Sequence, residues 1–182
     1  SCSHFLLGQY VFLSMSEASE WTDITLTFDV YFYVRETGIM LRYQDDDHYY
    51  QYIYNPEASC QGIVKRNGTG LSNRQTPVYL WNSPEAGAGV PRYTWARMRI
   101  DMYDNGSDQP TMDVYVNDQL VATYTDTDGS ALSKGTIGFY SAYNAATRFD
   151  NIRVTRKTTP LDTARADVAL RAVGAPPLPI PG

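Results

Sequence analysis

The sequence predicts an all-β domain in which two antiparallel sheets pack together as a sandwich. Three observations lead to this fold class: strand-length stretches of alternating polar and apolar residues recur, turn residues separate nearly all of them, and no helical pattern precedes residue 160. Short strands without helices each bury one face against a second sheet, and a sandwich is preferred over a barrel. The 182 residues, 43% of them hydrophobic, are enough to build such a core.

The clearest strand spans residues 23–33, where Ile, Leu, Phe and Val alternate with Thr, Asp and Tyr. Residues 39–44 and 48–54 alternate on either side of the turn triplet Asp45-Asp46-Asp47, and together they predict a hairpin. Between two later stretches, the pair Asn117-Asp118 predicts a tight hairpin turn. The remaining strands are expected at residues 62–66, 78–81, 95–103, 112–116, 120–125, 136–143 and 148–154.

The strand pattern divides the chain into one domain and a tail. We expect the β domain to occupy residues 1–156. Residues 157–182 then form a C-terminal tail or linker, in which residues 160–173 could form one short helix and residues 175–182 are rich in proline. Cys2 and Cys60 are too few for a disulfide scaffold and lack metal-ligand spacing, and both a single bridge and two free thiols remain open.

The charge and hydrophobicity of the chain disfavour two kinds of partner. The formal net charge is -5, and affinity for nucleic acid depends on neutralising phosphates with Lys and Arg, so we expect no nucleic-acid partner. No apolar run reaches the length of about 18 residues that a membrane-spanning helix needs. We therefore expect no membrane span.

One face of the predicted hairpin carries side chains suited to a sugar. Strict alternation places Arg42 and Gln44 on one face of the first strand, and Tyr49 and Gln51 on one face of the second. Sugars offer hydroxyls for polar contacts and apolar ring faces for aromatic packing. The alternative is a plain solvated surface, because an exposed sheet face needs polar residues in any case.

Three further residues extend this candidate site. Arg97 and Arg99 alternate along the strand at 95–103 and would favour an acidic sugar. Trp81 precedes a loop rich in Gly and Pro, where its ring would form a stacking platform or else lie buried. The predicted carbohydrate-binding residues are therefore Arg42, Gln44, Tyr49, Gln51, Trp81, Arg97 and Arg99.

Five segments, in their order and spacing, resemble the concanavalin A-like lectin/glucanase superfamily, in particular its laminin-G-like and levan-binding modules. They are Glu20-Trp21-Thr22-Asp23, the stretch from Gly38 to Asp45, His48-Tyr49-Tyr50, the stretch from Gly135 to Tyr140, and the closing stretch from Phe149 to Val154. The resemblance covers residues 5–156 and implies a two-sheet antiparallel jelly roll that binds carbohydrate on a concave sheet face or on rim loops. It also places Asp150 where relatives commonly have a calcium ligand.

The sequence contains no recognisable catalytic constellation. Closely spaced strand carboxylates of the kind glycosidases use are missing, and His4 and His48 have no evident nucleophile, base or metal partner. We therefore expect a secreted, extracellular module, not an enzyme, that binds a polysaccharide or glycan, with calcium as the one candidate cofactor. The main alternative is a structural subunit that self-associates or contacts an adjacent domain through its C-terminal tail, and a polysaccharide lyase or glycoside hydrolase is the third.

Overall fold

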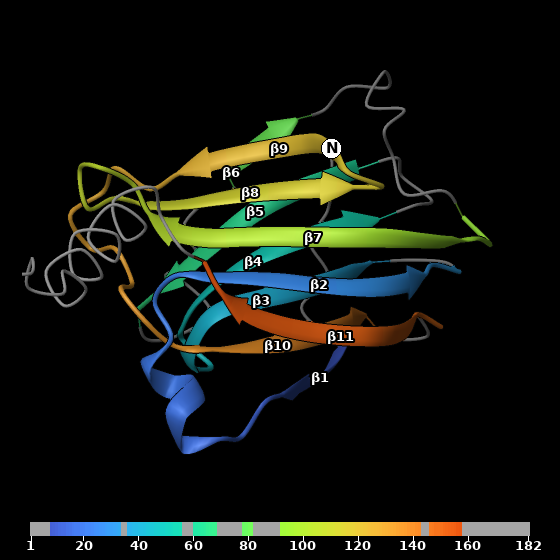
Figure 1. Ribbon diagram of the computed structural model, residues 1–182, viewed down its shortest axis with the longest axis horizontal. Helices are drawn as coiled ribbons and strands as arrows, with labels where there is room; N and C mark the ends of the chain where they lie inside the picture. Colours follow the sequence, from blue (N-terminus) through green and yellow to red (C-terminus); the bar gives the residue numbers. More distant parts are fainter. Residues whose placement is uncertain are drawn as a thin grey trace, which may run out of the picture.

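The computed structural model describes residues 8–33, 36–55, 60–68, 78–81, 92–142 and 146–157, which form two packed antiparallel sheets (Figure 1). The strands are β1 (Gly8–Phe12), β2 (Ile24–Tyr31), β3 (Thr37–Asp45), β4 (His48–Asn55), β5 (Cys60–Asn67), β6 (Val78–Trp81), β7 (Trp95–Asp104), β8 (Pro110–Val116), β9 (Gln119–Thr125), β10 (Thr136–Ala142) and β11 (Arg148–Arg156). A short 3-10 helix, η1 (Ser16–Glu20), follows β1. The six-stranded sheet has the order β1-β10-β3-β4-β5-β6, and the five-stranded sheet has the order β11-β2-β7-β8-β9. The predicted all-β jelly roll is confirmed.

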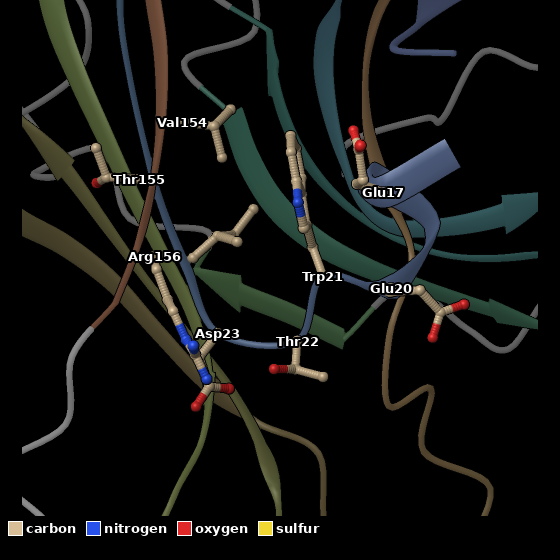
Figure 2. Close-up of a pocket in the computed structure, with 9 residues that line it drawn as sticks. Glu17, Glu20, Trp21, Thr22, Asp23, Val154, Thr155 and Arg156 are labelled. Carbon is tan, nitrogen blue, oxygen red and sulfur yellow. The ribbon is translucent and has the colours of Figure 1, made fainter. Parts of the chain in front are cut away.

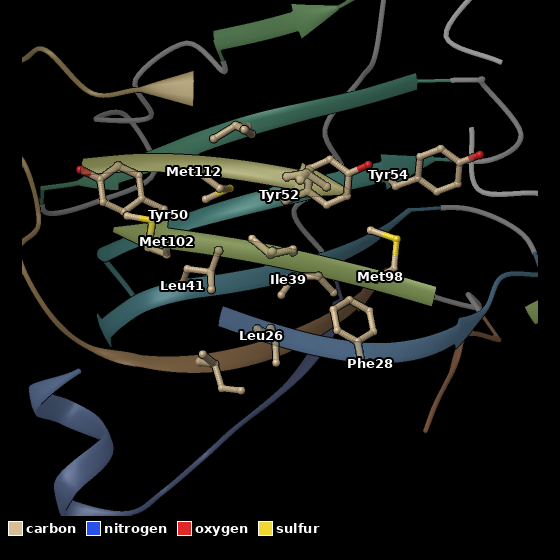
Figure 3. Close-up of a cluster of buried hydrophobic side chains, with 14 of the residues drawn as sticks. Leu26, Phe28, Ile39, Leu41, Tyr50, Tyr52, Tyr54, Met98, Met102 and Met112 are labelled. Carbon is tan, nitrogen blue, oxygen red and sulfur yellow. The ribbon is translucent and has the colours of Figure 1, made fainter. Parts of the chain in front are cut away.

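The core lies between the two sheets and is built by the alternating residues that the sequence identifies. In β2, Leu26 and Phe28 are fully buried, and Thr27 between them is half-buried. Ile39 and Leu41 of β3 belong to the same buried cluster from the other sheet (Figure 3). Each such side chain contributes about 1.5–3 kcal/mol by leaving water, so the burial pattern holds the two sheets together.

A bulge in β3 changes the face of Arg42. The residue has φ 48, and the pairing of β3 with β4 shifts between Leu41 and Asp45. The Arg42 side chain is 1% exposed, and its Nη1 donates to the carbonyl of Leu132 at 2.7 Å. Its Nη2 lies 2.9 Å from the Asp104 carboxylate. The prediction that Arg42 belongs to the polar outer face is therefore wrong, because a bulge adds a residue that strict alternation does not count.

A buried ion pair holds the segment between β9 and β10. Lys65 Nζ lies 2.7 Å from Asp126 Oδ2, and both side chains are almost fully buried. The hydroxyl of Tyr50 donates to the same carboxylate oxygen at 2.5 Å, and it accepts from the backbone N–H of Leu132 at 3.2 Å. Together with Arg42, these contacts fix the segment from Asp126 to Leu132 against the end of the sandwich where β3 and β4 meet.

Several sequence predictions fall outside the described part of the chain. They concern the helix at 160–173, the proline-rich stretch at 175–182, the pairing of Cys2 with Cys60, and the side chain of Trp81. The division into a domain at 1–156 and a tail stays a prediction for the same reason. Within the described ranges, no helix has both the length and the apolar character to cross a membrane.

Candidate functional site

The outer face of the six-stranded sheet, which points away from the core, has an apolar middle. Met40, Tyr43, Tyr140 and Ala142 form a second buried cluster there, and Tyr49 packs against it. The β4 residue opposite Met40 is a buried glutamine, Gln51, whose Nε2 has no hydrogen-bond partner among the described residues. Charged groups lie instead at the end of this face, where β3 and β4 meet.

Three aromatic rings, Phe12, Tyr43 and Tyr49, run from β1 to β4 at this end, and we call them the aromatic row. The rings of Phe12 and Tyr43 are stacked with their centroids 5.1 Å apart, and those of Tyr43 and Tyr49 are stacked at 6.0 Å. Phe12 is 44% exposed. The row therefore presents aromatic surface of the kind that packs against the apolar face of a sugar ring.

A hollow of about 470 Å³ opens beside the aromatic row. Its lining includes Phe12, Tyr43, Gln44, Lys134 and Glu20. Gln44 Nε2 donates to the carbonyl of Lys134 at 2.8 Å, and Lys134 Nζ pairs with the Glu20 carboxylate at 2.6 Å. The hollow thus combines aromatic rings with a few polar groups, and its volume is in the range of small-molecule sites.

The turn between β3 and β4 orients an imidazole. His48 Nδ1 lies 2.7 Å from Asp45 Oδ1, and the backbone N–H of Asp47 donates to the same oxygen at 2.8 Å. Burial raises the pKa of Asp45, but the hydrogen bonds from Asp47 and His48 outweigh it and hold this pKa below its usual value. An ionised carboxylate can only accept, so Nδ1 donates, and in the neutral imidazole Nε2 is then the acceptor. This is the arrangement of a general base positioned by a carboxylate.

A guanidinium borders the same end of the face. Arg66 Nη2, on β5, lies 2.6 Å from Asp47 Oδ1, and Arg66 also hydrogen-bonds to Tyr49. Burial alone would lower the pKa of Arg66, but the interactions with Tyr49 and Asp47 raise it above its usual value, so the group stays charged. Asp47 thus links Arg66 and Tyr49 to the Asp45–His48 pair at the β3–β4 turn, and we call the set of Tyr43, Asp45, Asp47, His48, Tyr49 and Arg66 the hairpin site.

A second pocket, of about 450 Å³, adjoins η1 and the end of β11 (Figure 2). In Figure 2 the indole of Trp21 stands between Glu17 of η1 and Val154 of β11. Asp23, which also lines the pocket, accepts the backbone N–H of Asp104 at 3.0 Å. The pocket offers an indole and carboxylates but no imidazole, so we consider it less suited to proton transfer than the hairpin site.

The structure separates the residues that the sequence groups together. Tyr49 lies in the hairpin site, Gln44 lines the neighbouring hollow, and Gln51 lies further along the same face. Arg97 and Arg99 lie on β7, with their side chains on the outer face of the five-stranded sheet on the far side of the core. One continuous site from all seven predicted residues is therefore ruled out by the strand order.

The predicted calcium ligand Asp150 lies in a surface network of ion pairs and hydrogen bonds. Asp150 lies opposite Asp29, whose carboxylate is already engaged by Arg97 at 2.9 Å and by Asn151 at 2.6 Å. Calcium binds about 6–8 oxygen ligands. Within the described ranges, no group of three or more His, Cys, Asp or Glu side chains could hold a metal ion. Calcium binding stays a prediction.

Five of the six hairpin-site residues were not selected from the sequence: Tyr43, Asp45, Asp47, His48 and Arg66. The signal for His48 was present, because a histidine three residues after an aspartate across a tight turn can reach that carboxylate. Arg66 could not be assigned, because only the pairing of β4 with β5 brings it opposite Tyr49.

The comparisons with known proteins bear on this site. A family model described as the 3-keto-alpha-glucoside-1,2-lyase-like domain matches residues 11–155, which is most of the chain. The chain belongs to this family. Among curated proteins, none matches the lyase-like domain.

Solved structures support the fold of the lyase-like domain. The galectin LEC-6 of Caenorhabditis elegans has a TM-score of 0.55 at 9% identity, over 82% of this chain and 91% of the galectin. A putative glycosyl hydrolase from Parabacteroides distasonis has a TM-score of 0.55 at 12% identity, over 84% and 85%. The alginate lyase Aly36B reaches 0.50 at 12% identity, over 81% and 73%. The concanavalin A-like resemblance is confirmed.

Family membership also corrects one expectation. The prediction that the chain is not an enzyme is wrong, because the family model that matches it describes a lyase-like domain. The sequence argument failed because it found neither the paired carboxylates of glycosidases nor a partner for His48. The chain is a carbohydrate-active jelly-roll domain.

Proposed function

We propose that the lyase-like domain cleaves a keto-glucoside by elimination at the hairpin site. The family name describes a lyase that acts at C1 and C2 of an α-glucoside oxidised at C3. A C3 carbonyl acidifies the proton on C2, so the reaction needs a base at C2 and stabilisation of negative charge on the C3 oxygen. The hairpin site offers a candidate for each need.

In this proposal, His48 Nε2 removes the C2 proton, and the electron pair of the C–H bond moves to the C3 oxygen as an enolate. The charged Arg66 and the Tyr49 hydroxyl stabilise the enolate. When the enolate collapses, the C1–C2 double bond forms, the bond from C1 to the glycosidic oxygen breaks, and the leaving oxygen takes the proton from the imidazolium. The Asp45–His48 hydrogen bond is the observation that carries the proposal, because with Nδ1 as the donor the neutral imidazole accepts a proton at Nε2.

The aromatic row supplies the positioning that such a reaction requires. Phe12 and Tyr43 line the hollow, and Tyr43 also belongs to the hairpin site, so a sugar packed on these two rings would lie beside that site. Proximity of this kind lowers a barrier without chemistry of its own. The extracellular location expected from the sequence stays a prediction.

The test uses the purified chain and p-nitrophenyl 3-keto-α-glucoside. We expect nitrophenol release together with an unsaturated ketone product, and His48→Gln should lower kcat/KM by about 10²–10⁴-fold, the usual contribution of a general base. His4→Gln, the other histidine of the sequence, is the matched control and should keep full activity.

Two results would overturn the proposal. The first is full activity of His48→Gln in a folded protein. The second is equal cleavage of the unoxidised p-nitrophenyl α-glucoside, because without the C3 carbonyl the C2 proton is not acidic enough for elimination.

A further inference from the structure

We propose that the outer face of the five-stranded sheet carries a second carbohydrate site, one for a glycan strand that bears carboxylates. Its core is four aromatic residues, Tyr31, Tyr33, Tyr93 and Trp95, which we call the aromatic platform. Tyr31 of β2 pairs directly with Trp95 of β7. Because Val30 is buried in the core, Tyr31 and its cross-strand neighbour Trp95 point outward, away from the sheet that carries the hairpin site.

The aromatic platform exposes rings that are already fixed in place. Trp95 is 50% exposed and Tyr93 is 53% exposed. The Tyr31 and Trp95 rings pack edge to face at 5.6 Å, and the Tyr33 and Tyr93 rings do so at 6.0 Å. Tyr31 and Tyr33 are 4.8 Å apart and connect the two pairs. The exposed rings therefore lose little rotamer freedom when a ligand covers them, which favours binding.

The backbone of Tyr93 is held in a conformation that a tyrosine rarely adopts. Its φ is 61, in the left-handed region, where a bulky residue is an outlier. The N–H of Tyr93 donates to the Phe32 carbonyl at 2.9 Å, and Arg92 Nη2 donates to the Tyr93 hydroxyl at 3.0 Å. Strain that persists under such restraints is typical of functional positions. Here it places the Tyr93 ring beside Tyr33.

The charges around the aromatic platform favour an anionic ligand. Arg148, which pairs with Tyr31 from β11, lies with its guanidinium 5.6 Å from the centre of the Tyr33 ring. Arg92 lies over the Tyr93 ring at 5.0 Å. Arg97 forms an ion pair with Asp29 at 2.9 Å, and Asp150 lies opposite Asp29. Around the platform, the three arginines Arg92, Arg97 and Arg148 therefore outnumber the two carboxylates Asp29 and Asp150.

These features select the ligand class. The exposed ring faces suit the C–H faces of pyranose rings, and the planar Arg148 guanidinium is exposed and can form paired hydrogen bonds with a carboxylate. A polyuronate chain has pyranose C–H faces and carboxylates, and both recur along its length. Several shallow contacts with one such polysaccharide chain also suit an open sheet surface better than a deep pocket.

The experiment is affinity electrophoresis of the full chain through gels that contain polygalacturonate or, in parallel, dextran. We expect retardation by polygalacturonate alone, weakened by added salt. Trp95→Ala and Arg148→Gln should each weaken it by about tenfold, the size expected for loss of a stacked ring or a charged contact. The control is Leu120→Ala, which removes an equally exposed apolar side chain from β9 of the same sheet and should have no effect.

Each outcome decides the proposal. Equal retardation of Trp95→Ala and the unmodified chain would overturn the platform, and equal retardation by dextran would overturn the preference for carboxylates. His48→Gln separates this inference from the proposed reaction: it should lower keto-glucoside turnover by about 10²–10⁴-fold and leave retardation intact. If His48→Gln abolished retardation, the polymer would be held at the hairpin site and the second site would be rejected.

Discussion

Leu41 and Arg42 are neighbours in the sequence, yet both side chains point to the inner side of the sheet. The left-handed backbone at Arg42 sends its guanidinium inward to Asp104 and Leu132, and the next residue, Tyr43, lies in the aromatic row outside. A single bulge thus makes one residue a structural anchor and the next a part of the candidate site. Bulges recur next to functional sites for this reason.

The anchoring role of Arg42 leads to a prediction about stability. Arg42→Met should lower the free energy of unfolding by about 3–5 kcal/mol, because it leaves Asp104 and the Leu132 carbonyl without their buried partner. Urea unfolding measures the change. The matched control is Arg97→Met: its ion pair with Asp29 is solvent-exposed, so the loss should stay below about 1 kcal/mol. Equal losses in the two variants would contradict the assignment.

At this scale the sequence allowed only part of the candidate site to be predicted. Tyr49 was identified from alternation alone, since β4 continues without a bulge. Arg42 was misplaced because no residue-type signal marks a bulge. Arg97 was assigned to the same site as Tyr49 because alternation gives the face of a strand but not the sheet to which the strand belongs.

Among the elements, β4 contributes one face to the core and the other face to the outer surface of the six-stranded sheet. Tyr50, Tyr52 and Tyr54 point into the core, whereas Tyr49 and Gln51 lie on the outer face. Burial, followed by the nearby Asp126 carboxylate, raises the pKa of Tyr50 well above its usual range. Burial likewise raises the pKa of Tyr52 and of Tyr54.

The inward tyrosines of β4 predict sensitivity to alkali. Their folded-state pKa values are raised, so the stability they contribute is complete below the ordinary value of 10 and is lost as the pH rises beyond it. We expect a cooperative alkaline unfolding in which phenolate absorbance and loss of near-ultraviolet circular dichroism rise together. If all tyrosines ionised near pH 10 with the fold intact, the buried environment of β4 would be disproved.

The strands themselves were the most predictable level. Every strand from β2 to β11 was expected within a few residues, because apolar and polar residues alternate in strands such as β2, which have one face on the core. β1 was missed. It is an edge strand whose one partner in the sheet is β10, so it carries a weaker constraint on its side chains.

For the whole molecule, the two proposed sites lie on outward faces of different sheets with the core between them. Substitutions at distant sites without shared contacts usually have additive effects. The double variant His48→Gln with Trp95→Ala should therefore show the turnover of the first single variant and the gel retardation of the second. Measuring both properties on all four proteins tests this, and a turnover deficit that deepens with Trp95→Ala would show that the faces are coupled.

The fold alone does not determine the chemistry of the molecule. Structures similar to this chain include a galectin, a putative glycosyl hydrolase and an alginate lyase, which differ in what their names say they do. The family model describes a lyase-like domain. An elimination needs a base and not the paired carboxylates of a glycosidase, and the proposed base is His48 at the β3–β4 turn.

The pairing of β1 with β10 has a consequence for synthesis on the ribosome. Gly8 pairs with Ala142, and β2 has β7 and β11 as its two neighbours, so neither sheet can be completed until nearly the last strand has been translated. Contacts so distant in sequence slow folding and prolong the exposure of unpaired strands. In the nascent chain, β1 and β2 are therefore exposed to solvent before the strands that pair with them have been synthesised. A chaperone would have its largest effect during this interval.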